Sequence, residues 1–237
     1  MDGAHEIYPQ ATSRLPLHMR ILVRFLRIFF KYLYHQMAWT YDGVAAIVSL
    51  GKWKQWVLAV LPRLSGPYIL ELGHGPGHLQ AALLERQPSL EFVAGLDRSH
   101  QMGRQARKRL LRGGLQPSLV NGTAFQLPFP SNTFNQVVAT FPTDYIAHPL
   151  AIAEVMRVLS PGGSLIVVPV AWITGRRPEE RLAALLFRVT SQAPPYNKTT
   201  RYDRALEPLV KAGFQARAEL VHLPASTILV LEATKPA

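Results

Sequence analysis

The sequence predicts an α/β protein with a seven-stranded, mostly parallel sheet, and three observations lead to this prediction. From residue 67 onward, short apolar runs alternate with segments of helical periodicity, which is the pattern of βαβ units. The first apolar run ends in closely spaced glycines, as a strand does where it breaks into a tight turn. The last two apolar runs are joined by a short Leu-Pro-Ala turn, which predicts a terminal antiparallel hairpin.

The apolar runs give the order of the elements. We place the strands over residues 67–72, 91–96, 117–121, 134–140, 163–170, 214–222 and 226–233. Residues 1–62 are predicted to be an N-terminal helical extension, and residues 63–237 the sheet domain. A polar, proline-bearing stretch over residues 171–201 is too long for an ordinary connection, so we expect an insertion that covers the site.

Residues 15–37 are apolar except for a regular series of cations, Arg20, Arg24, Arg27 and Lys31, spaced i, i+4, i+7 and i+11. On a helix these cations form one narrow stripe, so the segment is predicted to be an amphipathic helix. Four cations in a bilayer core would cost roughly 2.5–3.5 kcal/mol each, which disfavours a spanning helix. The helix either lies in the membrane interface or covers the sheet domain with its apolar face.

The composition limits the chemistry. A net charge of +11 favours an anionic partner, either nucleic acid or an anionic membrane surface. The absence of cysteine excludes disulfides, thiolate metal sites and mechanisms with a cysteine nucleophile, and we predict no metal ion. Residues 1–13 lack the basic region of a secretory signal, so we expect a cytoplasmic protein that is peripheral to a membrane.

The glycine-rich turn within residues 69–79 is the main candidate for a ligand site. Gly73, Gly75 and Gly77 give the spacing Gly-x-Gly-x-Gly, and His78 stands where a dinucleotide fingerprint has its last glycine, which argues against NAD. Glu71 lies just before the turn and can anchor a positively charged ligand. Asp97 ends the next strand, about 20 residues further on, where a carboxylate can bind ribose hydroxyls.

Further motifs follow in order. Residues 97–102 read Asp-Arg-Ser-His-Gln-Met, residues 122–129 read Gly-Thr-Ala-Phe-Gln-Leu-Pro-Phe, and residues 154–163 read Glu-Val-Met-Arg-Val-Leu-Ser-Pro-Gly-Gly. Together with the glycine turn, these motifs resemble those of the class I, Rossmann-like methyltransferases that depend on S-adenosylmethionine (SAM). Thr123 and Asn135 depart from the family pattern, which has an acid at each position.

The resemblance implies a cofactor and the residues that bind it. The cofactor would be SAM, and the product S-adenosylhomocysteine. The cofactor-binding residues would be Tyr41, Glu71, Gly73, His74, Gly75, Gly77, Asp97, Arg98, Met102, Thr123, Ala124, Phe125, Thr140 and Phe141.

The segment before the first strand carries a second resemblance. Residues 41–43 read Tyr-Asp-Gly, and residues 49–56 read Ser-Leu-Gly-Lys-Trp-Lys-Gln-Trp. This order is similar to the lead-in of the ubiquinone/menaquinone-biosynthesis methyltransferases and of bacterial phospholipid N-methyltransferases, which act on lipid-soluble substrates. Alternatively, Trp53 and Trp56 pack against the sheet.

The acceptor is expected beside the carboxyl ends of the first and fourth strands. The candidate catalytic residues there are Asp144, Tyr145 and His148. A carbon acceptor needs a base, which Asp144, His148 or His74 could provide, whereas an amine could be held by Tyr145 or Phe141 through cation–π contact. Alternatively, Asp144 is the N-cap of a helix over residues 145–158.

We therefore expect a SAM-dependent methyltransferase that acts at the membrane surface on a hydrophobic small molecule, either a quinone precursor or a lipid. The alternatives are an RNA or protein methyltransferase, and a protein that binds SAM without catalysis. A basic cluster over residues 104–112 could bind phosphate, but it lacks interleaved aromatics and is better explained as a solvated helix face, so we do not expect a nucleic-acid partner.

Overall fold

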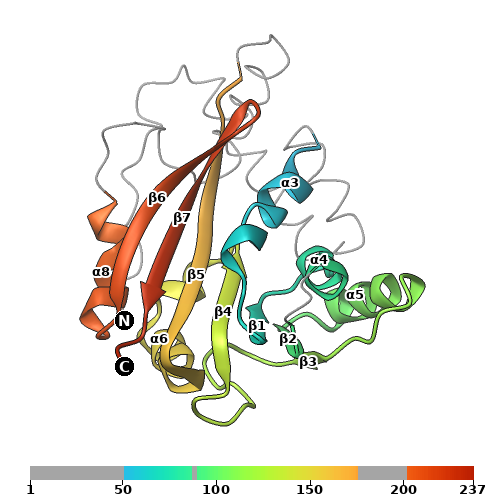
Figure 1. The fold of residues 1–237 in the computed structure, drawn as a ribbon, viewed down its shortest axis with the longest axis horizontal. Coiled ribbons are helices and arrows are strands. Elements are labelled where there is room, and N and C mark those ends of the chain that lie inside the picture. Colours follow the sequence, from blue (N-terminus) through green and yellow to red (C-terminus); the bar gives the residue numbers. More distant parts are fainter. Residues whose placement is uncertain (1–50, 87–89, 176–201) are drawn as a thin grey trace, which may run out of the picture.

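The described residues form a single seven-stranded sheet between two layers of helices (Figure 1). The computed structural model describes residues 51–86, 90–175 and 202–237. The strand order is β3-β2-β1-β4-β5-β7-β6, with neighbouring strands parallel except where β7 pairs with β5 and with β6. The predicted fold class and the terminal antiparallel hairpin are therefore confirmed.

The strand bounds agree with the sequence prediction within two residues at every end except those of β5. The strands are β1 (Tyr68–Leu72), β2 (Phe92–Asp97), β3 (Leu119–Asn121), β4 (Phe134–Thr140), β5 (Leu159–Ile173), β6 (Gln215–Leu223) and β7 (Ser226–Thr234). Strand β5 extends to Ile173 because Ala171, Trp172 and Ile173 are buried and pair with β7. The predicted start of the insertion at residue 171 was therefore wrong by three residues, and residues 176–201 lie outside the described part of the chain.

Two hydrophobic cores flank the sheet. On one side lie α3 (Trp53–Leu58), α4 (His78–Arg86) and α5 (His100–Arg112), and on the other α6 (Pro149–Val158) and α8 (Asp203–Lys211). Successive residues of β1 alternate between these layers, so that Ile69 packs with Leu79 of α4 and Leu70 with Ile152 of α6. By the same alternation, Glu71 faces the α4 layer.

The segment before β1 shares the core of the sheet. Trp56, Val60 and Leu64 are buried beside the sheet, and Trp56 Nε1 donates a hydrogen bond of 2.9 Å to Ser226 Oγ of β7. The interpretation that a tryptophan packs against the sheet is confirmed for Trp56. Residues 15–37 and Tyr41 lie outside the described residues, and their roles remain predictions.

Candidate active site

The turn between β1 and α4 has a backbone that favours glycine. Gly73, Gly75 and Gly77 have φ angles of 72°, 51° and 82°, in the left-handed region. The backbone N–H groups of Gly73 and His74 donate to the carbonyl of Leu96 in β2, at 2.7 and 3.3 Å. These bonds hold the turn over the carboxyl ends of β1 and β2.

The three glycines of the turn have different surroundings. A Cβ added to Gly77 would lie 2.9 Å from Ala106 Cβ of α5, so this glycine permits close packing of α5 against the turn. A Cβ added to Gly73 would lie 3.1 Å from the Tyr145 hydroxyl. At Gly75, no atom of the described residues would lie within 4 Å of the added Cβ. The open side of the turn is therefore at Gly75, where a ligand can approach the backbone.

Asp97 joins the turn to the end of β2. Its Oδ2 accepts a hydrogen bond from the Gly75 N–H at 2.9 Å, and its Oδ1 accepts from the Ser99 N–H at 2.8 Å. Each carboxylate oxygen has a second lone pair, so both can still accept from the hydroxyls of a ribose. Asp97 therefore shapes the turn in addition to its predicted role as a ligand-binding residue.

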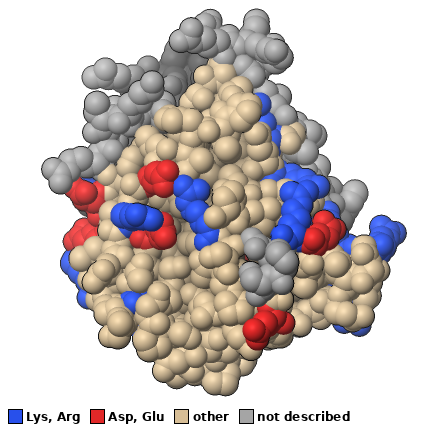
Figure 2. Space-filling model, viewed as in Figure 1, with Lys and Arg blue, Asp and Glu red and all other residues tan. Residues whose placement is uncertain are grey.

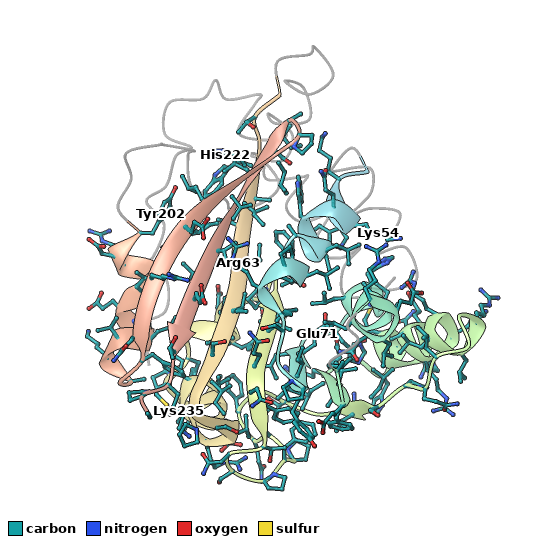
Figure 3. All side chains as sticks on the ribbon, viewed as in Figure 1. Lys54, Arg63, Glu71, Tyr202, His222 and Lys235 are labelled. Carbon is teal, nitrogen blue, oxygen red and sulfur yellow. The ribbon has the colours of Figure 1, made fainter. Side chains whose placement is uncertain are left out.

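Glu71 is buried below the turn on the α4 side of β1, where Figure 3 labels it. Its side chain is 1% exposed, and Gln80 Nε2 of α4 donates to Glu71 Oε2 at 2.8 Å. Burial raises the pKa of Glu71 to about 8, which the Gln80 hydrogen bond opposes and the charge of Asp97 reinforces. The sequence reasoning did not identify Gln80, because nothing in its spacing distinguishes it from other residues of the helix.

His74 lies in the turn but is also buried. Its Nδ1 is 2.7 Å from the Gly75 carbonyl oxygen, which can only accept, so Nδ1 carries the proton. Burial lowers the pKa of His74, which favours the neutral ring. The ring packs against β2, since a Cβ on Gly95 would lie 3.1 Å from His74 Cδ2. His74 thus lies beneath the turn rather than on its open side.

The predicted adenine segment follows β3. Thr123 Oγ1 accepts a hydrogen bond from the Phe125 N–H at 3.3 Å, and Ala124 is buried. Phe125 is 41% exposed, and its ring centroid lies 4.8 Å from that of His148. The segment therefore has an exposed ring at Phe125. At Thr123 it has a hydroxyl, whereas the family pattern has an acid at that position.

The other predicted cofactor residues of this region lie at the start of α5. Arg98 is exposed, whereas Met102 is buried and its N–H donates to Ser99 Oγ, the N-cap of α5, at 3.3 Å. The second departure from the pattern, Asn135, lies at the opposite end of the sheet, where its Oδ1 accepts from the Tyr68 N–H at 3.2 Å. This departure therefore does not affect the glycine turn.

Aromatic side chains gather where β4 ends. Phe141 directly follows Thr140, has a φ angle of 50°, and donates its N–H to the Val168 carbonyl at 2.7 Å. Its ring centroid lies 4.5 Å from that of Trp53 and 6.1 Å from that of Trp56. The strained backbone of Phe141 is thus held by a β5 carbonyl and by two tryptophans of α3.

Tyr145 lies beside the glycine turn, where its hydroxyl would be 3.1 Å from a Cβ added to Gly73. Its hydroxyl donates to the Leu72 carbonyl at the end of β1, at 3.3 Å. Burial raises the pKa of Tyr145, and the charges of Asp97 and Glu71 raise it further, so the phenol stays protonated at neutral pH. Tyr145 is therefore a protonated phenol beside Gly73 whose single O–H is directed to the Leu72 carbonyl, and it cannot act as a base at the turn.

Asp144 and His148, the other two candidate catalytic residues, are exposed. Asp144 begins a short 3₁₀ helix, η3 (Asp144–Ala147), and α6 begins at Pro149 with His148 as its N-cap. His148 Nδ1 accepts from the Leu150 N–H at 3.2 Å. The interpretation of Asp144 as the cap of a helix over residues 145–158 is therefore wrong, because Pro149 is favoured at the first helical position and places the cap at His148.

The Glu-x-x-Arg motif clamps the loop after β3. Arg157 binds Glu154 through two hydrogen bonds of 2.7 and 2.9 Å, and it donates to the carbonyls of Leu127 and Phe129. Glu154 Oε2 in turn accepts from the Leu127 N–H at 2.6 Å. The motif thus fixes the loop that follows Thr123, Ala124 and Phe125.

Comparison with known proteins agrees with this geometry. The family described as a methyltransferase domain matches residues 69–163. Residues 69–163 form a methyltransferase domain. The sheet has the Rossmann-like arrangement, and the open backbone at Gly75 beside Asp97 fits SAM, the cofactor that the sequence motifs imply.

The sequence relatives of the methyltransferase domain are quinone-biosynthesis enzymes. A demethylmenaquinone methyltransferase of Thermus thermophilus is 31% identical over 57% of this chain and 63% of its own length. The ubiquinone/menaquinone biosynthesis C-methyltransferase UbiE of Bordetella avium is 33% identical over 57% of this chain and 54% of its own length. The chain thus spans less than two thirds of the length of these curated relatives.

Solved structures of other proteins have the same fold as most of this chain. A SAM-dependent methyltransferase from Aquifex aeolicus aligns with a TM-score of 0.58 and 18% identity over 79% of this chain and 96% of its own. The [4+2]-cyclase SpnF aligns with a TM-score of 0.54 and 18% identity over 78% of this chain and 80% of its own. Because a cyclase also has this fold, the fold alone does not identify the reaction.

Proposed function

We propose that the chain transfers a methyl group from SAM to a planar, hydrophobic small molecule of the quinone-precursor class. The observation that carries the proposal is the aromatic cluster of Trp53, Trp56 and Phe141 at the end of β4, next to the strand whose end forms the glycine turn. Aromatic rings stack favourably with flat ring systems. The names of the quinone-biosynthesis relatives support the same class of acceptor.

The chain would contribute mainly by binding and orienting the reactants. When bound, SAM supplies an electrophilic methyl group on a sulfonium. Asp97 would accept hydrogen bonds from the ribose hydroxyls, and Trp53 and Phe141 would hold the ring of the acceptor by stacking. Tyr145, protonated at neutral pH, would turn its one O–H from the Leu72 carbonyl to an oxygen of the acceptor.

The proposal assigns no general base among the exposed candidates. Asp144 and His148 lie outward, and the Nδ1 of His148 is engaged by the α6 backbone. A phenol-type acceptor becomes electron-rich in its ring when its hydroxyl proton passes to water; the ring carbon would then form a bond to the methyl group as the bond from methyl to sulfur breaks, and the C–H proton of that carbon would pass to solvent. The reaction then depends on orientation and on exclusion of water more than on a protein base.

Action at a membrane surface is the second part of the proposal. Among the described residues, no helix is both long enough and apolar enough to cross a bilayer. The predicted amphipathic helix over residues 15–37 would lie in the interface, where each cation contributes about 1 kcal/mol near anionic lipid. On the face drawn in Figure 2, basic and acidic side chains are interspersed, with the salt bridges Arg63–Glu219 and Arg217–Glu232 among the described residues.

The basic cluster on α5 gives less support to an RNA methyltransferase. Arg109 of this cluster donates to the Pro76 carbonyl of the turn, so it has a structural partner. Arg104, Arg107, Lys108 and Arg112 are exposed, but the helix that carries them, α5, contains no Phe, Trp or Tyr. Nucleic-acid binding by stacking requires aromatics interleaved with the cations.

The test is methyl transfer from isotopically labelled SAM to a demethylated quinone precursor in vesicles, followed by mass spectrometry. Label in the ring of the precursor is the expected result. Phosphatidylethanolamine vesicles and total RNA serve as competing acceptors, and label in either would overturn the quinone assignment. Binding of SAM without label in any acceptor would instead indicate a non-catalytic SAM-binding protein.

A further inference from the structure

Two polar side chains form an isolated pair between β1 and α4. Glu71 is 1% exposed and Gln80 is completely buried. Gln80 Nε2 donates to Glu71 Oε2 at 2.8 Å and has a second, longer contact of 3.4 Å to the Ala94 carbonyl. The donor side of the Gln80 amide is therefore well satisfied.

The acceptor side of the same amide is not satisfied. Gln80 Oε1 is buried and has no hydrogen-bond partner among the described residues. A buried acceptor without a donor is costly and requires an explanation. An ionised Glu71 cannot provide the donor, because a carboxylate only accepts, whereas a neutral carboxylic acid has one O–H to donate.

The space for this pair is created by a glycine on β2. Gly95 lies opposite Glu71 in the sheet, and a Cβ there would lie 3.1 Å from Gln80 Cδ and 2.9 Å from Leu119 Cδ2. The missing side chain lets the amide lie flat against β2, in reach of Glu71. The geometry is thus built from three elements, β1, β2 and α4.

We propose that Gln80 is a positioning residue that holds Glu71 as a neutral acid in a two-hydrogen-bond pair, and that a cationic cofactor at the turn displaces the Glu71 proton to solvent. In this pair the Glu71 O–H donates to Gln80 Oε1 while Gln80 Nε2 donates back. The second half of the proposal rests on the proposed function, because it requires SAM or its product at the turn.

The groups that surround Glu71 are consistent with a neutral acid in the free protein. Asp97 at the end of β2 disfavours a second negative charge, and it raises the pKa of Glu71 in addition to burial. His74 in the turn has a lowered pKa and Tyr145 of η3 a raised one, so neither provides a compensating positive charge. A bound ammonium or sulfonium group would supply that charge and favour the carboxylate.

The first experiment uses the free protein. Infrared spectra of wild type minus Glu71→Gln should contain the carbonyl band of a protonated acid that disappears with a midpoint at about pH 8. Gln80→Met should move this midpoint downward, because the neutral acid loses the acceptor of its O–H, and an upward shift would overturn the role of Gln80. Gln215→Met, the same change at an exposed site on β6, should leave it in place. A midpoint near the ordinary value of 4.5 would overturn the inference whether or not the protein binds SAM.

The second experiment counts protons during binding. Calorimetry of S-adenosylhomocysteine binding, in buffers with different ionisation enthalpies, should show release of about one proton below pH 8 and none well above it. Glu71→Gln, which can form both hydrogen bonds as an amide pair, should release none. Methylthioadenosine, which lacks the amino-acid group, should also release none from wild type. Proton-free binding of S-adenosylhomocysteine at neutral pH would overturn the second half of the proposal, whereas absence of binding would overturn the proposed function and leave the infrared result standing.

Discussion

The two halves of the candidate site are built in different ways. The cofactor half consists of a short turn whose backbone is fixed by hydrogen bonds to Asp97 and to the Leu96 carbonyl. The acceptor half consists of aromatic rings from α3 and from the residue after β4, which meet through packing. In the proposed function, local backbone geometry would therefore define where the cofactor binds, whereas long-range contacts would define which acceptor fits beside it.

The largest effect is expected at Gly75. Gly75→Val places a β-branched side chain at a φ angle of 51° and fills the open side of the turn, so SAM binding measured by calorimetry should be lost. Gly162→Val is the matched control, with a φ angle of 73° and no described atom within 4 Å of the added Cβ. If both variants bind SAM equally well, the cofactor half does not lie at this turn.

The buried acid of the cofactor half should make stability depend on pH. The pKa of Glu71 is about 8 in the folded protein against an ordinary 4.5, so the folded state holds the proton more tightly. Stability should be highest below about pH 4.5 as far as this group is concerned, and should fall until about pH 8, by roughly 1.4 kcal/mol for each unit of pKa difference. Glu71→Gln should remove this slope in urea unfolding, and an unchanged slope would show that Glu71 is not its source.

A smaller loss is expected at Asp97. Asp97→Ala removes the acceptor for the Gly75 N–H and a carboxylate for ribose, and hydrogen bonds to charged groups contribute about 1.5–3 kcal/mol. SAM affinity should fall roughly tenfold to a hundredfold by calorimetry. An unchanged affinity would contradict the role of Asp97 at the cofactor, and the comparison with Asp97→Asn would separate the charge from the shape of the side chain.

The smallest effect should be confined to the acceptor half. Trp53→Ala removes one partner of Phe141, and aromatic pairs contribute about 0.5–1.5 kcal/mol, so kcat/KM for the acceptor should fall about tenfold or less. SAM affinity should stay within about twofold, because Trp53 is not part of the turn. Equal losses for acceptor and cofactor would mean that the two halves are not independent.

The sequence predicted the geometry of the glycine turn better than that of the aromatic cluster. Gly73, Gly75 and Asp97 could be found because a positive φ angle and a strand-end carboxylate leave a local signature in the sequence. Gln80 could not be found, since its role depends on Gly95 in another strand. The prediction of Asp144 as the cap of a helix over residues 145–158 was wrong, because a 3₁₀ helix begins at Asp144 and α6 begins only at Pro149.

The strand predictions show the same difference between features that depend on the local sequence and features that depend on distant contacts. The apolar runs predicted the position of every strand. The length of β5 was not predicted, because it depends on pairing with β7, which lies far along the chain. Residues 171–173 therefore appeared to begin an insertion, although they are strand residues buried in the cores. Tertiary pairing of this kind has no local pattern.

The contact between Gly77 and Ala106 restricts how this turn can be redesigned. Any larger residue at either position would push α5 away from the backbone that receives the cofactor, because an added Cβ at Gly77 already lies within 2.9 Å of Ala106. Changes of cofactor preference introduced at the turn would therefore need compensating changes at Ala106, 29 residues downstream in α5. In directed evolution, single substitutions at these two positions should be depleted from functional libraries, while paired replacements should be the route by which this backbone acquires a new shape.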